Sequence, residues 1–145
     1  MATDVNNLGG VLRDLGDLAG ARAAYERALA IWQAAYGDEH PQVATAHNNL
    51  GMVLYDLGDL AGARAADERA LAIDERAFGP DHPQVASDVN NLGGVLQALG
   101  DLAGARAAFE RALRIFEKFL PPEHPYIRGV RGNLESLDRA ARGRK

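Results

Sequence analysis

The sequence predicts an all-α fold: a stack of antiparallel helical hairpins, or α-solenoid, that ends in a capping helix. Three observations predict it. The run Asn-Asn-Leu-Gly at Asn6 returns at Asn48 and Asn90, each time 42 residues later, and a fixed period of this size is typical of solenoid proteins. The ten residues from Leu15 recur unchanged from Leu57. Within each block, the apolar residues follow helical spacing.

The first helix of each unit is best seen in the second block. Val43, His47, the adjacent Leu50 and Gly51, and Leu54 recur at intervals of three or four residues and form one buried stripe of a helix. The Pro that follows His40, and likewise His82 and His124, suits the first position of a helix. The sequence therefore predicts that the first helix of this unit starts near residue 41.

The second helix follows after a short link. Gly58 can adopt the left-handed conformation that ends a helix, and Asp59 is placed to cap the next one. A link of two residues forces the two helices into an antiparallel hairpin. The second helix then ends at Gly79-Pro80. Applied to the whole chain, this pattern predicts a single domain over residues 1–145, with units at about 1–39, 40–81 and 82–123 and a capping helix at about 124–142.

Composition excludes several classes of protein. Of the 145 residues, 47% are hydrophobic and 25% are charged, as in ordinary globular proteins, and there is no cysteine. Disulfide frameworks, thiolate metal sites and cysteine nucleophiles are therefore excluded. No apolar run approaches the length of a membrane span, and the N-terminus does not resemble a signal peptide. We therefore expect a cytoplasmic protein.

The repeated positions resemble a known family. Across the units these positions are a Leu-Gly pair, a leucine, two alanines and an aromatic residue: Leu50, Gly51, Leu54, Ala63, Ala70, Tyr25 and Phe109. This pattern resembles the tetratricopeptide repeat, and the 42-residue spacing resembles the long-helix type found in kinesin light chain. Two departures stand out. Near the start of each repeat, where the family usually has tryptophan, this chain has Val5, His47 or Val89. In the second repeat, Asp67 replaces the aromatic residue.

The resemblance implies a non-catalytic interaction scaffold that binds an extended peptide of a partner protein in the concave groove lined by the first helices. Asparagine amides can donate to and accept from a peptide backbone. The residues expected to bind the peptide lie on the first helices and on the capping helix: Asn6, Asn7, Arg13, Asn48, Asn49, Met52, Tyr55, Asn90, Asn91, Gln97 and Asn133. Because Arg13 is the only cation among them and Asp14 and Asp56 lie nearby, we expect a neutral or basic peptide.

Other interpretations remain open at the level of sequence. The asparagines could bridge successive first helices and bind no ligand. The alternative function is a structural self-assembly module that forms homo-oligomers through the uncapped N-terminal face. The near identity of the units, 30 of 42 residues between 6–47 and 48–89, fits a recent duplication, a piece of a longer array or a consensus-like design.

Histidines and buried carboxylates are the remaining candidates for chemistry. His40, His82 and His124 stand at equivalent links, too far apart to share a metal ion, so we expect them to cap helices. In the second unit, His47 and Asp67 replace apolar residues. Either they form a compensating pair, which would raise the pKa of the histidine, or each is separately solvated. Asp74 likewise replaces Trp32 and Phe116, aromatics that we expect to pack on the next first helix.

Charge is distributed unevenly. Residues 1–110 hold 7 basic and 16 acidic side chains, and residues 111–145 hold 9 basic and 4 acidic ones. The mildly acidic whole argues against nucleic-acid binding, and no feature of the basic end indicates a membrane contact. No phosphate loop, nucleophile elbow or His-Glu-x-x-His motif occurs, so we expect no enzyme activity, no cofactor and no metal.

Overall fold

The computed structural model describes residues 1–143, so Arg144 and Lys145 of the basic end lie outside the described residues. Within this range the chain is all-α, as the repeats predict, and it contains no strand. Seven helices follow one another: α1 (Ala2–Asp14), α2 (Leu18–Tyr36), α3 (Pro41–Asp56), α4 (Leu60–Phe78), α5 (Pro83–Ala98), α6 (Leu102–Phe119) and α7 (Pro125–Arg142).

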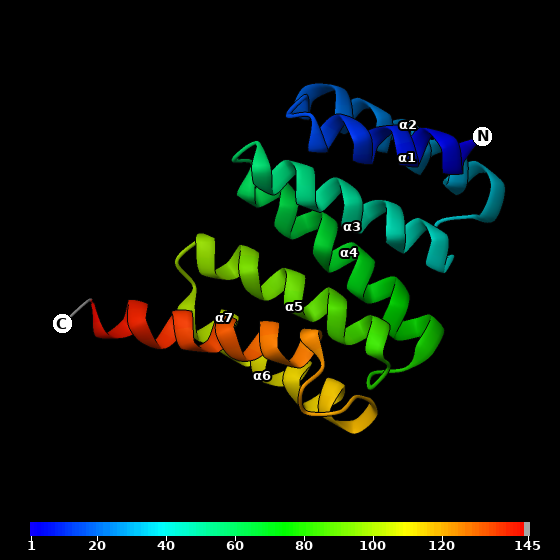
Figure 1. Ribbon diagram of the computed structural model, residues 1–145. Helices are drawn as coiled ribbons and strands as arrows, with labels where there is room; N and C mark the ends of the chain where they lie inside the picture. Colours follow the sequence, from blue (N-terminus) through cyan, green and yellow to red (C-terminus); the bar gives the residue numbers. More distant parts are fainter. Residues whose placement is uncertain (144–145) are drawn as a thin grey trace. The chain divides into compact units, whose positions relative to one another are not determined.

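The helices divide into two compact units, residues 1–77 and the chain from residue 78 onward. In the first, α1 contacts α2, and α2 contacts α3 (Figure 1). In the second, α6 contacts both α5 and α7, and α7 also contacts α5. The second helices α2 and α6 therefore each pack on their hairpin partner and on the first helix that follows. The single domain with repeat units of 42 residues remains a prediction.

The turns inside the hairpins have the geometry that their sequence predicts. Gly58 has a φ of 87°, in the left-handed region where glycine is favoured, and Gly16 and Gly100 have φ values of 86° and 88°. One residue later, Asp59 Oδ1 accepts a hydrogen bond of 2.9 Å from the backbone N–H of Gly62. An identical cap stands at Asp17 and Asp101. Each carboxylate satisfies an otherwise unpaired N–H at the start of a second helix.

The links between hairpins confirm the capping role expected of the histidines. His40 Nδ1 accepts a hydrogen bond of 3.0 Å from the backbone N–H of Gln42, and His82 and His124 cap α5 and α7 in the same way. The His40 ring also stacks on Tyr36, with ring centroids 4.4 Å apart. The imidazole therefore both starts a helix and packs against the helix before it.

The core of the compact unit formed by residues 1–77 lies between its helices. Trp32 is 5% exposed and packs with Val43, Ala44 and Ala46 of α3, as expected for an aromatic residue on this face. Tyr25 packs against Leu50 and Val53 of α3, and its ring also fills the space beside a glycine of α1.

That glycine allows the close approach of the two helices of a hairpin. A Cβ on Gly9 would lie 2.7 Å from the ring of Tyr25, and a Cβ on Gly93 would lie 2.7 Å from the ring of Phe109. A side chain at either position therefore overlaps the aromatic ring. In the hairpin of α3 and α4, a Cβ on Gly51 would lie 2.5 Å from Oδ1 of Asp67, so a carboxylate stands where the other hairpins have an aromatic ring.

Candidate functional site

The face lined by the asparagines is held together by side-chain amides. In the compact unit of residues 1–77, Asn49 Nδ2 of α3 donates to Asn6 Oδ1 of α1 over 2.8 Å. In the compact unit from residue 78 onward, Asn133 Nδ2 of α7 donates to Asn90 Oδ1 of α5 over 3.1 Å. Each bond joins the first helices of two successive hairpins. The asparagines therefore do bridge first helices, and each pair still holds three side-chain N–H donors and three acceptor sites that this bond does not use.

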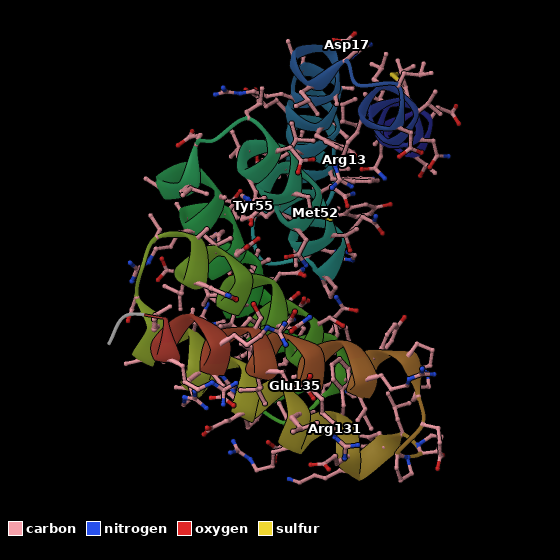
Figure 2. The ribbon with its side chains drawn as sticks, turned by 60° about the vertical axis from the view of Figure 1, so that its left-hand side comes forward. Arg13, Asp17, Met52, Tyr55, Arg131 and Glu135 are labelled. Atoms are coloured by element: carbon pink, nitrogen blue, oxygen red, sulfur yellow. The ribbon has the colours of Figure 1, made fainter. Side chains whose placement is uncertain are left out.

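An ion pair adds a second bridge between α1 and α3. Arg13 Nε donates to Asp56 Oδ2 over 2.7 Å, and this hydrogen bond is the main cause that raises the pKa of Arg13. Arg13 reaches from α1 toward α3, on which Met52 and Tyr55 lie (Figure 2). Tyr55 is 44% exposed, whereas Met52 is half-buried. The one cation of the predicted site is therefore neutralised by its own neighbour.

A pocket of about 310 Å³ opens between α5 and α7. Its lining carries no formal charge and combines hydroxyl, amide and aromatic groups with a glycine and a proline: Ser87, Asn90, Asn91, Phe116, Pro125, Tyr126 and Gly129. Phe116 is buried, and its ring lies 5.5 Å from that of Tyr126, which is 58% exposed. An uncharged pocket of this kind suits a neutral group with apolar and hydrogen-bonding parts.

The remaining predicted residues differ in accessibility. Asn7 is exposed, and Asn91 is half-buried at the pocket. Asn48 is only 9% exposed, which leaves a ligand little access to it. Gln97 Nε2 donates to Ser136 Oγ of α7 over 3.1 Å, so this amide also joins two first helices.

Sequence reasoning missed most of the pocket, because only Asn90 and Asn91 of its lining residues are among those expected to bind the peptide. Phe116 was assigned only to packing, because its side chain lies on a second helix. Tyr126 and Gly129 fall in the capping helix, where the repeat pattern changes, so equivalent positions in other units gave no guide. The signal that could have found them was the His-Pro pair at His124, which aligns α7 with the other first helices.

Of the two interpretations left open for His47 and Asp67, the structure supports unconnected side chains and not a compensating pair. Across the described residues no hydrogen bond or ion pair joins them, and His47 Nε2 is buried without a hydrogen-bond partner. Burial lowers the pKa of His47, helped by the nearby Arg69 and opposed by Asp38. Burial alone raises the pKa of Asp67 to about 7. The two groups are each destabilised in their charged form by burial, rather than stabilised by one another.

Asp74 is the second carboxylate on the same helix. Its side chain is almost fully buried, 1% exposed, and neither carboxylate oxygen has a hydrogen-bond partner in the range 1–143. The α4 helix therefore buries two carboxyl groups where the other second helices carry aromatic rings.

No group of three or more metal-ligating side chains is close enough to hold an ion anywhere in residues 1–143. Among the same residues, no helix has both the length and the apolarity needed to cross a membrane.

The family model of the tetratricopeptide repeat matches residues 1–76 and 42–118, and therefore most of the chain. The chain belongs to the tetratricopeptide repeat family. The chain departs from the family pattern in two ways: it lacks the usual tryptophan near the start of each repeat, and it has Asp67 in place of an aromatic residue. Both departures leave the hairpins intact. Among curated proteins no match was found.

Solved tetratricopeptide structures resemble this chain closely. BtubC (BKLC) from P. vanneervenii is 28% identical, with a TM-score of 0.88 over 97% of this chain and 56% of that one. A kinesin light chain-type protein with nearly identical repeats, from Podospora anserina, is 22% identical, with a TM-score of 0.88 over 96% and 66% of the two chains. This chain thus spans little more than half of BtubC. The repeats are of the kinesin light chain type.

A shorter tetratricopeptide structure, the first repeat domain of Spaghetti (RPAP3), is bound to an HSP90 peptide. It is 17% identical to this chain, with a TM-score of 0.69 over 97% of this chain and 92% of that one. At this identity the likeness shows the fold alone. Members of the tetratricopeptide repeat family are generally non-catalytic and act as protein-interaction scaffolds.

Proposed function

We propose that this protein is a non-catalytic scaffold that binds an extended segment of a partner protein along its first helices. The observation that carries the proposal is the uncharged pocket between α5 and α7, whose lining includes both Asn91 and the exposed ring of Tyr126. A peptide backbone can donate to and accept from an asparagine amide, while one of its side chains enters the pocket. The first repeat domain of Spaghetti (RPAP3), which has the same fold, is bound to an HSP90 peptide.

The chemistry of the face favours a neutral or basic peptide. Arg13 is already paired with Asp56, so it offers little attraction to a carboxylate. The lining of the pocket holds no cation either. An acidic peptide would therefore lose water from its carboxylates without gaining a partner of opposite charge.

An array of neutral, basic and acidic peptides, probed with the intact chain, tests this function. We expect neutral or basic peptides to bind, and Asn91→Ala to weaken the best of them about tenfold, the loss expected for one or two hydrogen bonds. Asn7→Ala is the comparison variant: Asn7 is the equivalent asparagine of the first repeat but lies outside the pocket, so we expect a smaller loss than for Asn91→Ala. Equal losses in both variants, or a preference for acidic peptides, would contradict the proposal.

A further inference from the structure

The pocket between α5 and α7 is lined by two residues that depart from the repeat. Tyr126 lines it, whereas the equivalent residue of α3 and of α5 is a glutamine. Gly129 also lines it, whereas the equivalent residue is a threonine in α3 and a serine in α5. Hairpins of this chain therefore stack without a tyrosine or a glycine at these positions, and the two residues need another explanation.

Gly129 is not explained by packing inside the protein. A Cβ on Gly129 would meet no atom within 4 Å, whereas a Cβ on Gly93 would overlap the ring of Phe109. Glycine in the interior of a helix is unfavourable relative to alanine. The lack of a side chain at Gly129 therefore serves no close approach of helices, and its effect is to keep the pocket open.

Tyr126 presents a ring that is held in place but not covered. Its ring lies edge-on to that of His124, with centroids 4.6 Å apart, and 5.5 Å from the ring of Phe116. The backbone N–H of Tyr126 also donates to His124 Nδ1 over 3.1 Å. These contacts restrict the ring, yet the residue remains 58% exposed. The pocket therefore has a fixed aromatic surface on which an apolar group can pack.

The polar groups of the lining are richer in donors than in acceptors. Asn90 Oδ1 accepts from Asn133 Nδ2, and this bond leaves both N–H groups of the Asn90 amide. The hydroxyl of Ser87 and the amide of Asn91 add further donors, and no lining residue is charged. The arrangement suits an uncharged ligand with carbonyl oxygens, an apolar ring and few N–H groups of its own.

We propose that this pocket takes a proline-rich segment of the partner in the polyproline II conformation, an inference that rests on the proposed peptide-binding function. A proline ring packs on Tyr126 in the space that Gly129 leaves, and the segment's carbonyl oxygens accept from Asn90 and Asn91. Because proline has no N–H, the segment brings few donors that would lose water without gaining a partner. A polyproline II helix is also preformed, so less conformational entropy is lost on binding.

A segment rich in aromatic side chains is the main competitor, because such a side chain would also pack on Tyr126. It fits the polar groups less well, since its backbone brings an N–H at every residue. One of the two acceptor sites of Asn90 Oδ1 is already taken by Asn133. Aromatic-lined grooves with hydrogen-bond donors recognise polyproline II segments in unrelated folds, which favours proline here.

Three capped, uncharged peptides of equal length test this specificity. They differ only in a central run, which is Pro-Pro-Ser-Pro, Ala-Ala-Ser-Ala or Phe-Phe-Ser-Phe. Isothermal titration calorimetry with the intact chain measures each affinity. We expect the proline peptide to bind at least about tenfold more tightly than either of the others. Equal affinities, or a preference for the phenylalanine peptide, would overturn the proposal.

Two variants place the residues of the other repeats in the pocket. Tyr126→Gln removes the ring, and Gly129→Thr fills the space beside it. Since α3 carries glutamine and threonine at these positions, we expect both variants to fold, which thermal unfolding checks. Each should weaken the proline peptide about tenfold and change the alanine peptide little. Full binding of the proline peptide by both variants would count against the pocket.

Tyr36→Gln is the matched control for Tyr126→Gln. Tyr36 is 55% exposed and stacks on a histidine ring, as Tyr126 contacts His124, but it lies outside the pocket. We expect this change to leave the affinity for the proline peptide unaltered. Equal losses from the two tyrosine variants would also overturn the proposal.

The same measurements separate this inference from the proposed function. If the alanine peptide binds as tightly as the proline peptide and Asn91→Ala weakens both, the scaffold function stands and the proline specificity is wrong. If none of the three peptides binds, and no peptide of the array binds either, the proposed function fails and this inference fails with it.

Discussion

Asp67 is a carboxyl group in surroundings where its counterparts are aromatic rings. Its side chain is 3% exposed, its carboxylate lies against Gly51, and burial raises its pKa from 3.8 to about 7. The folded state thus holds the proton more tightly than the unfolded state. Stability from this residue is fully present below about pH 4 and is lost as the pH rises toward 7.

Substitutions at Asp67 should remove this loss. We expect Asp67→Asn to abolish the fall in unfolding free energy between about pH 4 and 7, since the amide does not titrate. Asp67→Phe should raise the unfolding free energy at pH 8 by about 2–4 kcal/mol, because it removes a buried charge and places a ring beside Gly51. Urea unfolding at a series of pH values measures both. An unchanged pH profile in Asp67→Asn would contradict the assignment.

His47 should give the stability a dependence on pH opposite to that of Asp67. Burial, with help from Arg69, lowers its pKa below 6.5, so the folded state prefers the neutral ring. Stability is then lost as the pH falls below about 6.5, where the unfolded state takes up the proton first. We expect His47→Val to abolish this acid-side loss and to leave the Asp67 transition in place. The double variant His47→Val with Asp67→Asn should show neither transition in the same unfolding series.

At the scale of elements, each hairpin depends on close contact at one glycine. We expect Gly93→Ala to destabilise the chain by about 1–3 kcal/mol, because the new Cβ would lie 2.7 Å from the ring of Phe109. Gly94→Ala is the matched control, since a Cβ there meets nothing within 4 Å and alanine favours helix by about 1 kcal/mol. Thermal unfolding of the two variants should give shifts of opposite sign, and a shift of the same sign would be inconsistent with this packing.

The helix caps are the second contribution at this scale. Asp59→Ala removes the only side-chain acceptor for the Gly62 N–H, so we expect a loss of about 1 kcal/mol. Asp17→Ala and Asp101→Ala should lose similar amounts, because their caps have the same geometry. Asp59→Asn, which keeps an acceptor oxygen, is the control and should retain most of the stability. Chemical denaturation measures all four variants.

The helices and their caps could be predicted from sequence because they depend on local chemistry. Gly58 predicts the turn and Asp59 predicts the cap that follows it, and each His-Pro pair predicts the start of the next hairpin. The 42-residue period then supplied the packing partners. His47 and Asp67 could not be predicted in the same way, because polarity at two core positions does not reveal whether the side chains point toward one another.

The candidate site was predictable only in part. The repeated asparagines were placed correctly on the first helices, but spacing alone could not show that Asn6 and Asn49 bond to each other. The pocket was missed because it needs Phe116 from a second helix and Tyr126 from the capping helix. Such a site depends on the tertiary approach of three helices, which no single periodic pattern contains.

At the scale of the whole molecule, burial differs between equivalent helices. In α1 only Ala2 and Gly9 are buried, whereas in α3 seven residues are buried. Local opening therefore exposes less apolar surface at α1 than at α3. We expect amide hydrogens of α1 to exchange faster than those of α3. Hydrogen-exchange mass spectrometry measures this, and equal rates would show that the two helices open together.

The stacked rings at the links have a spectroscopic consequence. Tyr36 lies over His40, and Phe78 lies over His82, in both cases with ring centroids 4.4 Å apart. An aromatic ring at this distance shifts the proton resonances of the imidazole beneath it. The histidine signals in an NMR spectrum thus give a separate reporter on each link, one that needs no label and that disappears when the link comes apart.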